Sequence, residues 1–211
     1  MTELEVNFTN LGSYYVPSDT KDGICIDIGA NVGCFFESHN DHFSLIHYYE
    51  PVDQNWKICS SKVFENVVGY KEVASYNDDE TIELVAHENN HSGSCRVIND
   101  HPHWSKNVVA SATSCSFDRA VTRILEQSNR EFIDYMKLDC ECCEYDFLMN
   151  NDLSKIKYIG MELHNQLGKE KSSELYDWIS RTHNPSTEFG WFPDPNGRHL
   201  DILWTPKGDI E

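Results

Sequence analysis

The chain has 211 residues, of which 39% are hydrophobic and 12% aromatic, enough for one domain with a substantial hydrophobic core. Its 17 basic and 35 acidic residues give a formal charge of 17 − 35 = −18. A charge of this sign opposes attraction to nucleic acids and to anionic membranes. We therefore expect neither a nucleic acid nor a membrane as a partner. In addition, no apolar segment approaches the ~20 residues that a membrane span needs.

The eight cysteines and the N-terminus indicate the compartment. The start, MTELEVNFTN, has neither the basic flank nor the apolar run of a secretory signal, so we expect a cytoplasmic protein with reduced thiols. Cys140, Cys142 and Cys143 crowd into the run CECC with no second pair of ligands nearby. This spacing favours the end of a strand over a zinc site.

The first half of the chain is rich in strand signals. Short apolar or alternating runs predict strands over residues 24–28, 44–49, 67–74, 81–86 and 107–117. Residues 53–65 have a partial apolar face and predict a helix that Asp53 can cap. The polar, turn-rich segment 87–107 is expected to be a loop or hairpin.

The second half alternates helices and strands. Helices are predicted over 118–128, from about 140 to 149 and over 170–182. Strands are predicted over 133–139 and 156–163. The C-terminal part holds two β-rich runs joined by a turn at Pro193–Gly197. Strands that alternate with helices are typical of an α/β fold with a doubly wound sheet. We expect a mostly parallel sheet with an antiparallel C-terminal hairpin strand, in a single domain over residues 1–211.

The run GICIDIGANVGCF, residues 23–35, carries the first functional signal. A buried strand is followed by Gly29 and Gly33, and a glycine turn at this place lets the backbone approach a ligand closely. Glu50 lies 21 residues after Gly29, at the end of the next strand. An acidic residue there binds ribose hydroxyls in nucleotide-binding folds, so the pattern indicates an adenosine-type ligand.

The details of the turn favour one adenosine ligand over another. The glycine spacing differs from G-x-G-x-x-G, and Asp27 would face the phosphates of a dinucleotide. A carboxylate opposes a phosphate and suits a cation. S-adenosylmethionine carries an ammonium and a sulfonium and no phosphate, so it is favoured over NAD. The alternative for Asp27 is a turn or capping residue.

Several motifs in order extend this interpretation. The runs IDIGANVGCF, YEP, HSGSC, SFDRAV, IDYMKLDCECCEYDFL and IGMELH follow one another as in the FkbM-like methyltransferases, which the chain resembles from about residue 23 to 165. The resemblance implies a class I methyltransferase with a Rossmann-like sheet and S-adenosylmethionine as cofactor. It further implies O-methylation of a hydroxyl on a sugar, glycan or small natural product. The histidines and aromatic residues of the segment 87–107 suit a sugar surface, so we expect this segment to line the acceptor pocket.

The resemblance also implies the site. Cofactor contacts are expected from Asp27, Gly29, Ala30, Asn31, Gly33, Glu50, Pro51 and Asp139. The catalytic candidates are Asp139, Glu141 and His164, because a carboxylate or imidazole can take the proton of a hydroxyl acceptor. In an extended segment Asp139 and Glu141 would lie on the same side, about 7 Å apart. These residue types also suit a metal ion, but their spacing does not demand one and none is expected.

One departure keeps other functions open. Residues 137–144 match the family pattern K-I-D-V-E-G-x-E, with Cys142 in place of the glycine. If that position requires a positive φ, a cysteine is strained there. A non-catalytic module that binds the cofactor is therefore an alternative, and an NAD-dependent oxidoreductase on a related sheet is a second.

Overall fold

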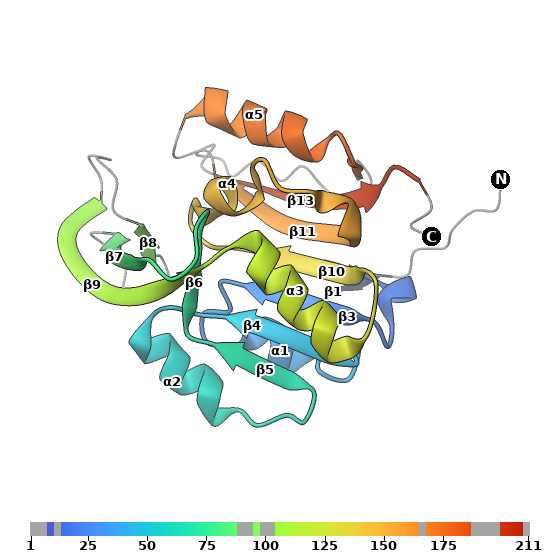
Figure 1. Cartoon of the computed structure of the whole chain (residues 1–211), viewed down its shortest axis with the longest axis horizontal. Coiled ribbons are helices and arrows are strands. Elements are labelled where there is room, and N and C mark those ends of the chain that lie inside the picture. Colours follow the sequence, from blue (N-terminus) through green and yellow to red (C-terminus); the bar gives the residue numbers. More distant parts are fainter. Residues whose placement is uncertain are drawn as a thin grey trace.

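The computed structural model describes residues 8–10, 14–87, 95–97, 104–164, 168–186 and 199–208. Its centre is a seven-stranded sheet in the order β12-β13-β11-β10-β3-β4-β5 (Figure 1). The strands are β3 (Ile24–Ile28), β4 (Leu45–Tyr49), β5 (Val67–Tyr70), β10 (Ile133–Leu138), β11 (Ile156–His164), β12 (His183–Pro185) and β13 (His199–Pro206). All pairs from β11 to β5 are parallel, and β13 is antiparallel to both β11 and β12. The predicted α/β sheet is therefore confirmed.

Helices cover both faces of this sheet. They are α1 (Cys34–His39), α2 (Asp53–Ser61), α3 (Phe117–Ser128), α4 (Cys143–Leu148) and α5 (Lys169–Ile179). Along β3, Ile24, Ile26 and Ile28 pack with residues of α3, α4 and α5, whereas Cys25 packs with residues of α1 and α2. This alternation is the period of two of a strand buried on both faces, and it makes the sheet doubly wound.

A second sheet stands beside the first, in the order β6-β9-β7-β8 (Figure 1). It consists of β6 (Glu72–Ala74), β7 (Thr81–His87), β8 (Cys95–Val97) and the long, bent β9 (Trp104–Cys115). The single strand predicted over 67–74 is wrong, because the chain leaves the main sheet after β5 and enters the second sheet as β6. The segment 87–107, predicted to be a loop or hairpin, contains β8 and the start of β9.

Four short elements complete the described part of the chain. The strands β1 (Phe8–Asn10) and β2 (Tyr15–Pro17) form a small antiparallel sheet, and the 3₁₀ turns η1 (Ser18–Thr20) and η2 (Leu153–Lys155) precede β3 and β11. The β1–β2 unit brings Tyr14 over the main sheet, with its ring centroid 5.3 Å from Lys137 Nζ.

The helix predicted over 53–65 needs two corrections. It ends at Ser61, and Val63, which lies beyond that end, is 88% exposed. Asp53 is the first helical residue and not the cap, and its carboxylate pairs with Lys71. The C-terminal hairpin forms between β12 and β13, and the turn predicted at Pro193–Gly197 lies outside the described residues.

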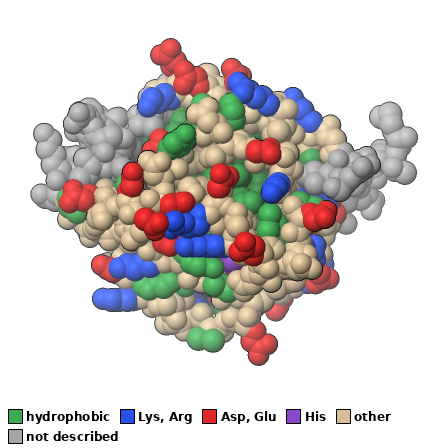
Figure 2. Space-filling view, in the orientation of Figure 1, with side chains coloured by type: hydrophobic (Ala, Val, Ile, Leu, Met, Phe, Trp, Pro, Cys, Tyr) green, Lys and Arg blue, Asp and Glu red, His purple; other side chains and the backbone are tan. Residues whose placement is uncertain are grey.

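Charged side chains of both signs are spread over the surface. On the face drawn in Figure 2, lysine and arginine side chains are interspersed with aspartate and glutamate. Among the described residues, no helix has the length and apolarity to cross a membrane.

Candidate active site

Two cavities meet at the carboxyl ends of β3 and β10. The first is bounded by both sheets and lined by Ile28, Gly29, Asn31, Tyr49, Glu50, Pro51, Val52, Asn55, Glu72, Val73, Ala74, Leu84, Asp139, Cys140, Glu141 and Cys143. The second lies toward α1 and the N-terminal segment and is lined by Tyr14, Gly29, Ala30, Asn31, Val32, Cys34, Phe35, Ser38, Lys137 and Asp139. Gly29, Asn31 and Asp139 line both, so they form the boundary between the cavities.

Gly29 is needed because two pieces of backbone meet there. Its φ is +75°, and a Cβ atom at this position would lie 1.9 Å from the carbonyl oxygen of Asp139. A side chain would therefore both strain the turn and push the end of β10 away. Gly33 has a φ of +80° just before α1 and lines neither cavity, and its expected contact with the cofactor stays a prediction.

Three backbone amides of the glycine turn donate hydrogen bonds within the protein. Gly29 and Ala30 donate from their backbone N–H groups to the carbonyl of Tyr49, at 3.0 and 3.1 Å. Asn31 donates from its N–H to Glu50 Oε2 at 2.8 Å. Dinucleotide-binding turns use such amides to hold a pyrophosphate. Here these three amides already have partners within the protein.

Glu50 ties the end of β4 to the glycine turn. It is 4% exposed, and Oε1 also accepts the N–H of Val52 at 2.8 Å. Burial raises the pKa of this carboxyl to about 7, against the opposing effect of the amides of Val52 and Asn31. Glu50 and Pro51 line the first cavity, where the sequence predicted a ribose-binding acid.

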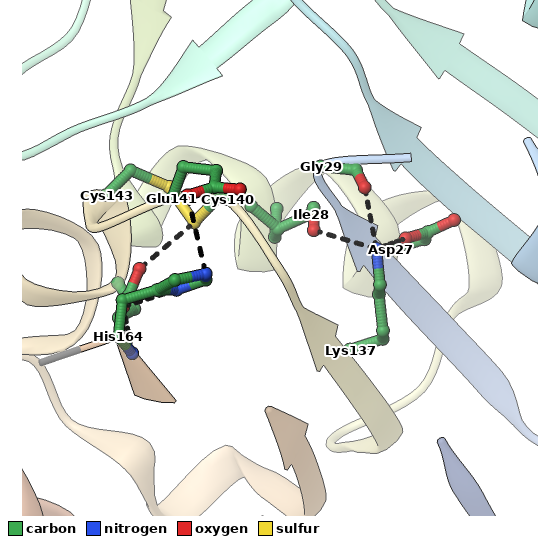
Figure 3. The surroundings of a disulfide bond; sticks show 9 residues. Asp27, Ile28, Gly29, Lys137, Cys140, Glu141, Cys143 and His164 are labelled. Atoms are coloured by element: carbon green, nitrogen blue, oxygen red, sulfur yellow. Dashed lines mark hydrogen bonds and ion pairs between the residues drawn. A yellow bond between two sulfur atoms is a disulfide. The ribbon is translucent and has the colours of Figure 1, made fainter. Parts of the chain in front are cut away.

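Asp27 lies beneath the turn rather than in either cavity. It is fully buried, and Oδ1 lies 3.0 Å from Lys137 Nζ (Figure 3). The ammonium also donates to the carbonyls of Ile28, at 3.3 Å, and Gly29, at 2.6 Å. The geometry supports an indirect role for Asp27, which fixes Lys137 and through it the backbone of the turn. Direct contact of Asp27 with the cofactor stays a prediction.

Asp139 is the acid at the boundary of the two cavities. Burial opposes the ionisation of Asp139. Three effects outweigh burial and hold the pKa of Asp139 below its usual range: the charge of Lys137, a hydrogen bond from the Tyr14 hydroxyl, and the charge of His164. Glu162 shares a hydrogen bond with it. Burial and the charge of Asp139 raise the pKa of Glu162 to about 8, which favours a proton on Glu162 over one on Asp139.

Glu141 reaches the first cavity by a turn and not by strand alternation. The strand ends at Leu138, and Glu141 has a φ of +53°, so the extended geometry expected for Asp139 and Glu141 is wrong. Both carboxylates nevertheless line the same cavity.

His164 is buried behind these acids. Its Nε2 lies 3.6 Å from carboxylate oxygens of Glu141 and of Glu162. Burial opposes protonation of the ring, but Glu144, Glu141 and Glu162 raise its pKa to about 10. The ring is 2% exposed and lines neither cavity. A protonated, buried imidazole is poorly placed to remove a proton, so the geometry supports a positioning role.

Asp139, Glu162 and His164 have the ligand types of a metal site, and their ligand atoms lie within 4.8 Å of one another. The imidazolium and the proton on Glu162 balance much of the acidic charge here. The expectation of no metal stays a prediction.

The cysteine run differs from the expectation of reduced thiols. Cys140 and Cys143 form a disulfide across the turn from β10 to α4, and both line the first cavity (Figure 3). Cys142 is a buried thiol outside the disulfide and has a φ of +79°, so the strain anticipated at this position is present.

Sequence reasoning missed Tyr14 and the wall that the second sheet contributes. Tyr14 precedes the matched motifs and carries no recognisable pattern, and Val73, Ala74 and Leu84 reach the cavity only through the chain's change of sheet. Much of the segment 87–107, proposed for the acceptor pocket, lies outside the described residues.

Comparison with known proteins identifies the family of this chain. A family model described as "Methyltransferase FkbM domain" matches residues 27–184. Among solved structures, Methyltransferase FkbM from Methylobacillus flagellatus is similar, with a TM-score of 0.51 and 14% identity over 87% of this chain and 43% of that one. At this identity the likeness shows the fold alone, and the chain spans less than half the length of that relative.

A second, more distant likeness is to M. capricolum TrmK in complex with S-adenosyl-homocysteine. Its TM-score is 0.42, with 10% identity over 88% of this chain and 62% of that one. No curated protein matches the sequence.

Proposed function

The chain belongs to the FkbM methyltransferase family, whose cofactor is S-adenosylmethionine, and we propose that it methylates a hydroxyl group of a sugar, glycan or small natural product. When bound, S-adenosylmethionine supplies a methyl group already activated by its sulfonium. The protein then has to position the acceptor oxygen and accept its proton.

The charges of the first cavity fit this cofactor. Its described lining contains the carboxylates Glu50, Glu72, Asp139 and Glu141 and no lysine or arginine. Such a lining suits a ligand with hydroxyls and positive charges, and it opposes phosphates. Glu50 would hold the ribose hydroxyls, and apolar groups such as Ile28, Val73 and Leu84 would flank the adenine.

The observation that carries the proposal is the place of Asp139. It lines the cofactor cavity and the second cavity at once, and it is held as an anion. An acceptor hydroxyl in the second cavity would therefore meet a carboxylate that can take its proton. The aromatic rings of Tyr14 and Phe35 and the hydroxyl of Ser38 in this cavity suit the mixed apolar and polar surface of a sugar.

The alternative of an NAD-dependent oxidoreductase loses support from the glycine turn. The amides of Gly29, Ala30 and Asn31 donate within the protein, so they offer no cradle for a pyrophosphate. The alternative of a binding module without turnover keeps one observation in its favour, the left-handed backbone at Cys142.

Titration calorimetry with S-adenosylhomocysteine and with NAD tests the cofactor. We expect binding of the first and none of the second. Methyl transfer is then tested by incubating the protein with S-adenosylmethionine and a panel of sugars and hydroxylated small molecules. A product heavier by one methyl group on oxygen is expected.

Variants distinguish the candidate bases. Asp139→Asn should abolish the product while Glu141→Gln slows it, with S-adenosylhomocysteine affinity measured in parallel for both. Full turnover by Asp139→Asn would refute the assignment of Asp139, and cofactor binding with no product from any acceptor would favour the binding module.

A further inference from the structure

The disulfide Cys140–Cys143 closes a turn whose backbone is otherwise unfavourable. The two residues inside it, Glu141 and Cys142, have φ angles of +53° and +79°. The left-handed region disfavours residues with a Cβ atom, and two such residues in succession are uncommon. A covalent link between the ends of this turn holds it in a shape that the local sequence does not favour.

This turn touches both halves of the active site. Its first backbone atoms pack on the cofactor turn, since a Cβ atom on Gly29 would lie 1.9 Å from the Asp139 carbonyl oxygen and 3.3 Å from Cys140 Cα. Its other side places the Glu141 carboxylate 3.6 Å from His164 Nε2. A change in the turn therefore moves a wall of the cofactor cavity and one of its acids together.

The sulfur atoms are also reachable. Cys140 is partly exposed, and both cysteines line the first cavity, which opens to solvent. A small dithiol can approach the bond through the space that the cofactor would occupy.

We propose that Cys140 and Cys143 form a thiol–disulfide switch that controls cofactor binding, with the disulfide form binding tightly and the dithiol form weakly. The proposal rests on the proposed function, because the ligand it regulates is the methyl donor. A dithiol reductant supplies two electrons and two protons. The Sγ–Sγ bond breaks, Cys140 and Cys143 become thiols, and the reductant becomes a disulfide. Without the link, the turn relaxes from its left-handed backbone and Glu141 withdraws from the cavity.

The test compares two preparations of the full chain, one equilibrated with oxidised dithiothreitol and one with the reduced form, each desalted before use. Counting of thiols after denaturation should give two more per chain in the reduced preparation, and mapping by alkylation and mass spectrometry should place them at Cys140 and Cys143. Titration calorimetry should show S-adenosylhomocysteine binding at least tenfold weaker in the reduced preparation.

Two variants sharpen the test. Cys140→Ser/Cys143→Ser should bind as weakly as the reduced protein, whatever the reductant. Cys142→Gly removes the unfavourable side chain at φ +79° and leaves the disulfide in place. It should therefore keep most of its affinity after reduction. Circular dichroism checks that each variant is folded.

The outcomes separate the switch from the proposed function. Equal affinity in the two preparations, or no gain of thiols at positions 140 and 143, would overturn the switch and leave the methyltransferase proposal standing. Absence of binding in both preparations would overturn the proposed function. A Cys142→Gly variant as sensitive to reduction as the unaltered chain would show that left-handed strain is not the cause.

Discussion

Glu144 accepts two hydrogen bonds from His164, one from the backbone N–H and one from ring Nδ1, each at 3.0 Å. The first turn of α4 is thereby attached to the end of β11. Because Nδ1 is engaged, Nε2 is the ring nitrogen directed at Glu141 and Glu162. His164, held by Glu144, therefore orients the acids Glu141 and Glu162, although His164 itself lines neither cavity.

We expect Glu144→Gln to lower the free energy of unfolding at pH 7 by about 2–3 kcal/mol, because it weakens buried, charge-assisted hydrogen bonds. Urea denaturation measures the loss. Glu126→Gln, at an exposed position of α3, is the matched control and should change little. Equal stability of the two variants would contradict the role of Glu144.

The same pair predicts a pH dependence of stability. The pKa of His164 is raised to about 10 in the folded protein, from 6.5 in an unfolded chain. The folded state thus favours the protonated ring, and this contribution is complete below about pH 6.5 and is lost as the pH rises through about 10. It amounts to a few kcal/mol, so stability should fall between pH 7 and pH 10. His164→Gln should show a clearly shallower fall, and an unchanged slope would contradict the assignment.

Glu50→Gln should weaken S-adenosylhomocysteine binding by about 1–3 kcal/mol, since a carboxylate accepts ribose hydroxyls better than an amide does. The pKa of Glu50 is about 7, so affinity should rise as the pH increases from 6 to 8 and the acid ionises. That rise should be reduced in Glu50→Gln. Asp53→Asn, an exposed acid three residues on, is the control and should bind normally. A variant with unaltered affinity would refute the ribose assignment.

Lys137 and Asp27 should behave as a coupled pair. Lys137→Met leaves a buried carboxylate without its cation and should cost about 3–5 kcal/mol of stability. Combining it with Asp27→Asn should cost clearly less than the sum of the two single changes, because no buried charge is then left alone. Additive losses in a denaturation cycle would contradict the pairing.

Gly29→Ala should destabilise the protein and weaken cofactor binding, because the new Cβ atom would collide with the Asp139 carbonyl. Gly168→Ala is the matched control, since its φ is +101° but nothing lies within 4 Å of its added Cβ atom. Both substitutions carry backbone strain, and only the first carries the collision. Equal losses of stability and affinity would show that strain alone accounts for Gly29.

The sequence alone was enough to predict the parallel sheet, the glycine turn and an acid at the end of the next strand, Glu50. Each depends on local patterns: buried runs of strand length, small residues that permit left-handed backbone, and a charge at a strand end. The family motifs are also local patterns, and their order along one continuous stretch predicts S-adenosylmethionine as the methyl donor.

How these residues contact one another depends on the tertiary fold. Packing places Asp27 under the turn with Lys137, and carboxylates from separate segments raise the pKa of His164 against the opposing effect of burial. The second sheet and Tyr14 reach the cavities from parts of the chain that carry no motif. The disulfide depends on a turn with two left-handed residues, which the run CECC does not reveal. Such relationships arise from packing between distant segments, and no local pattern encodes them.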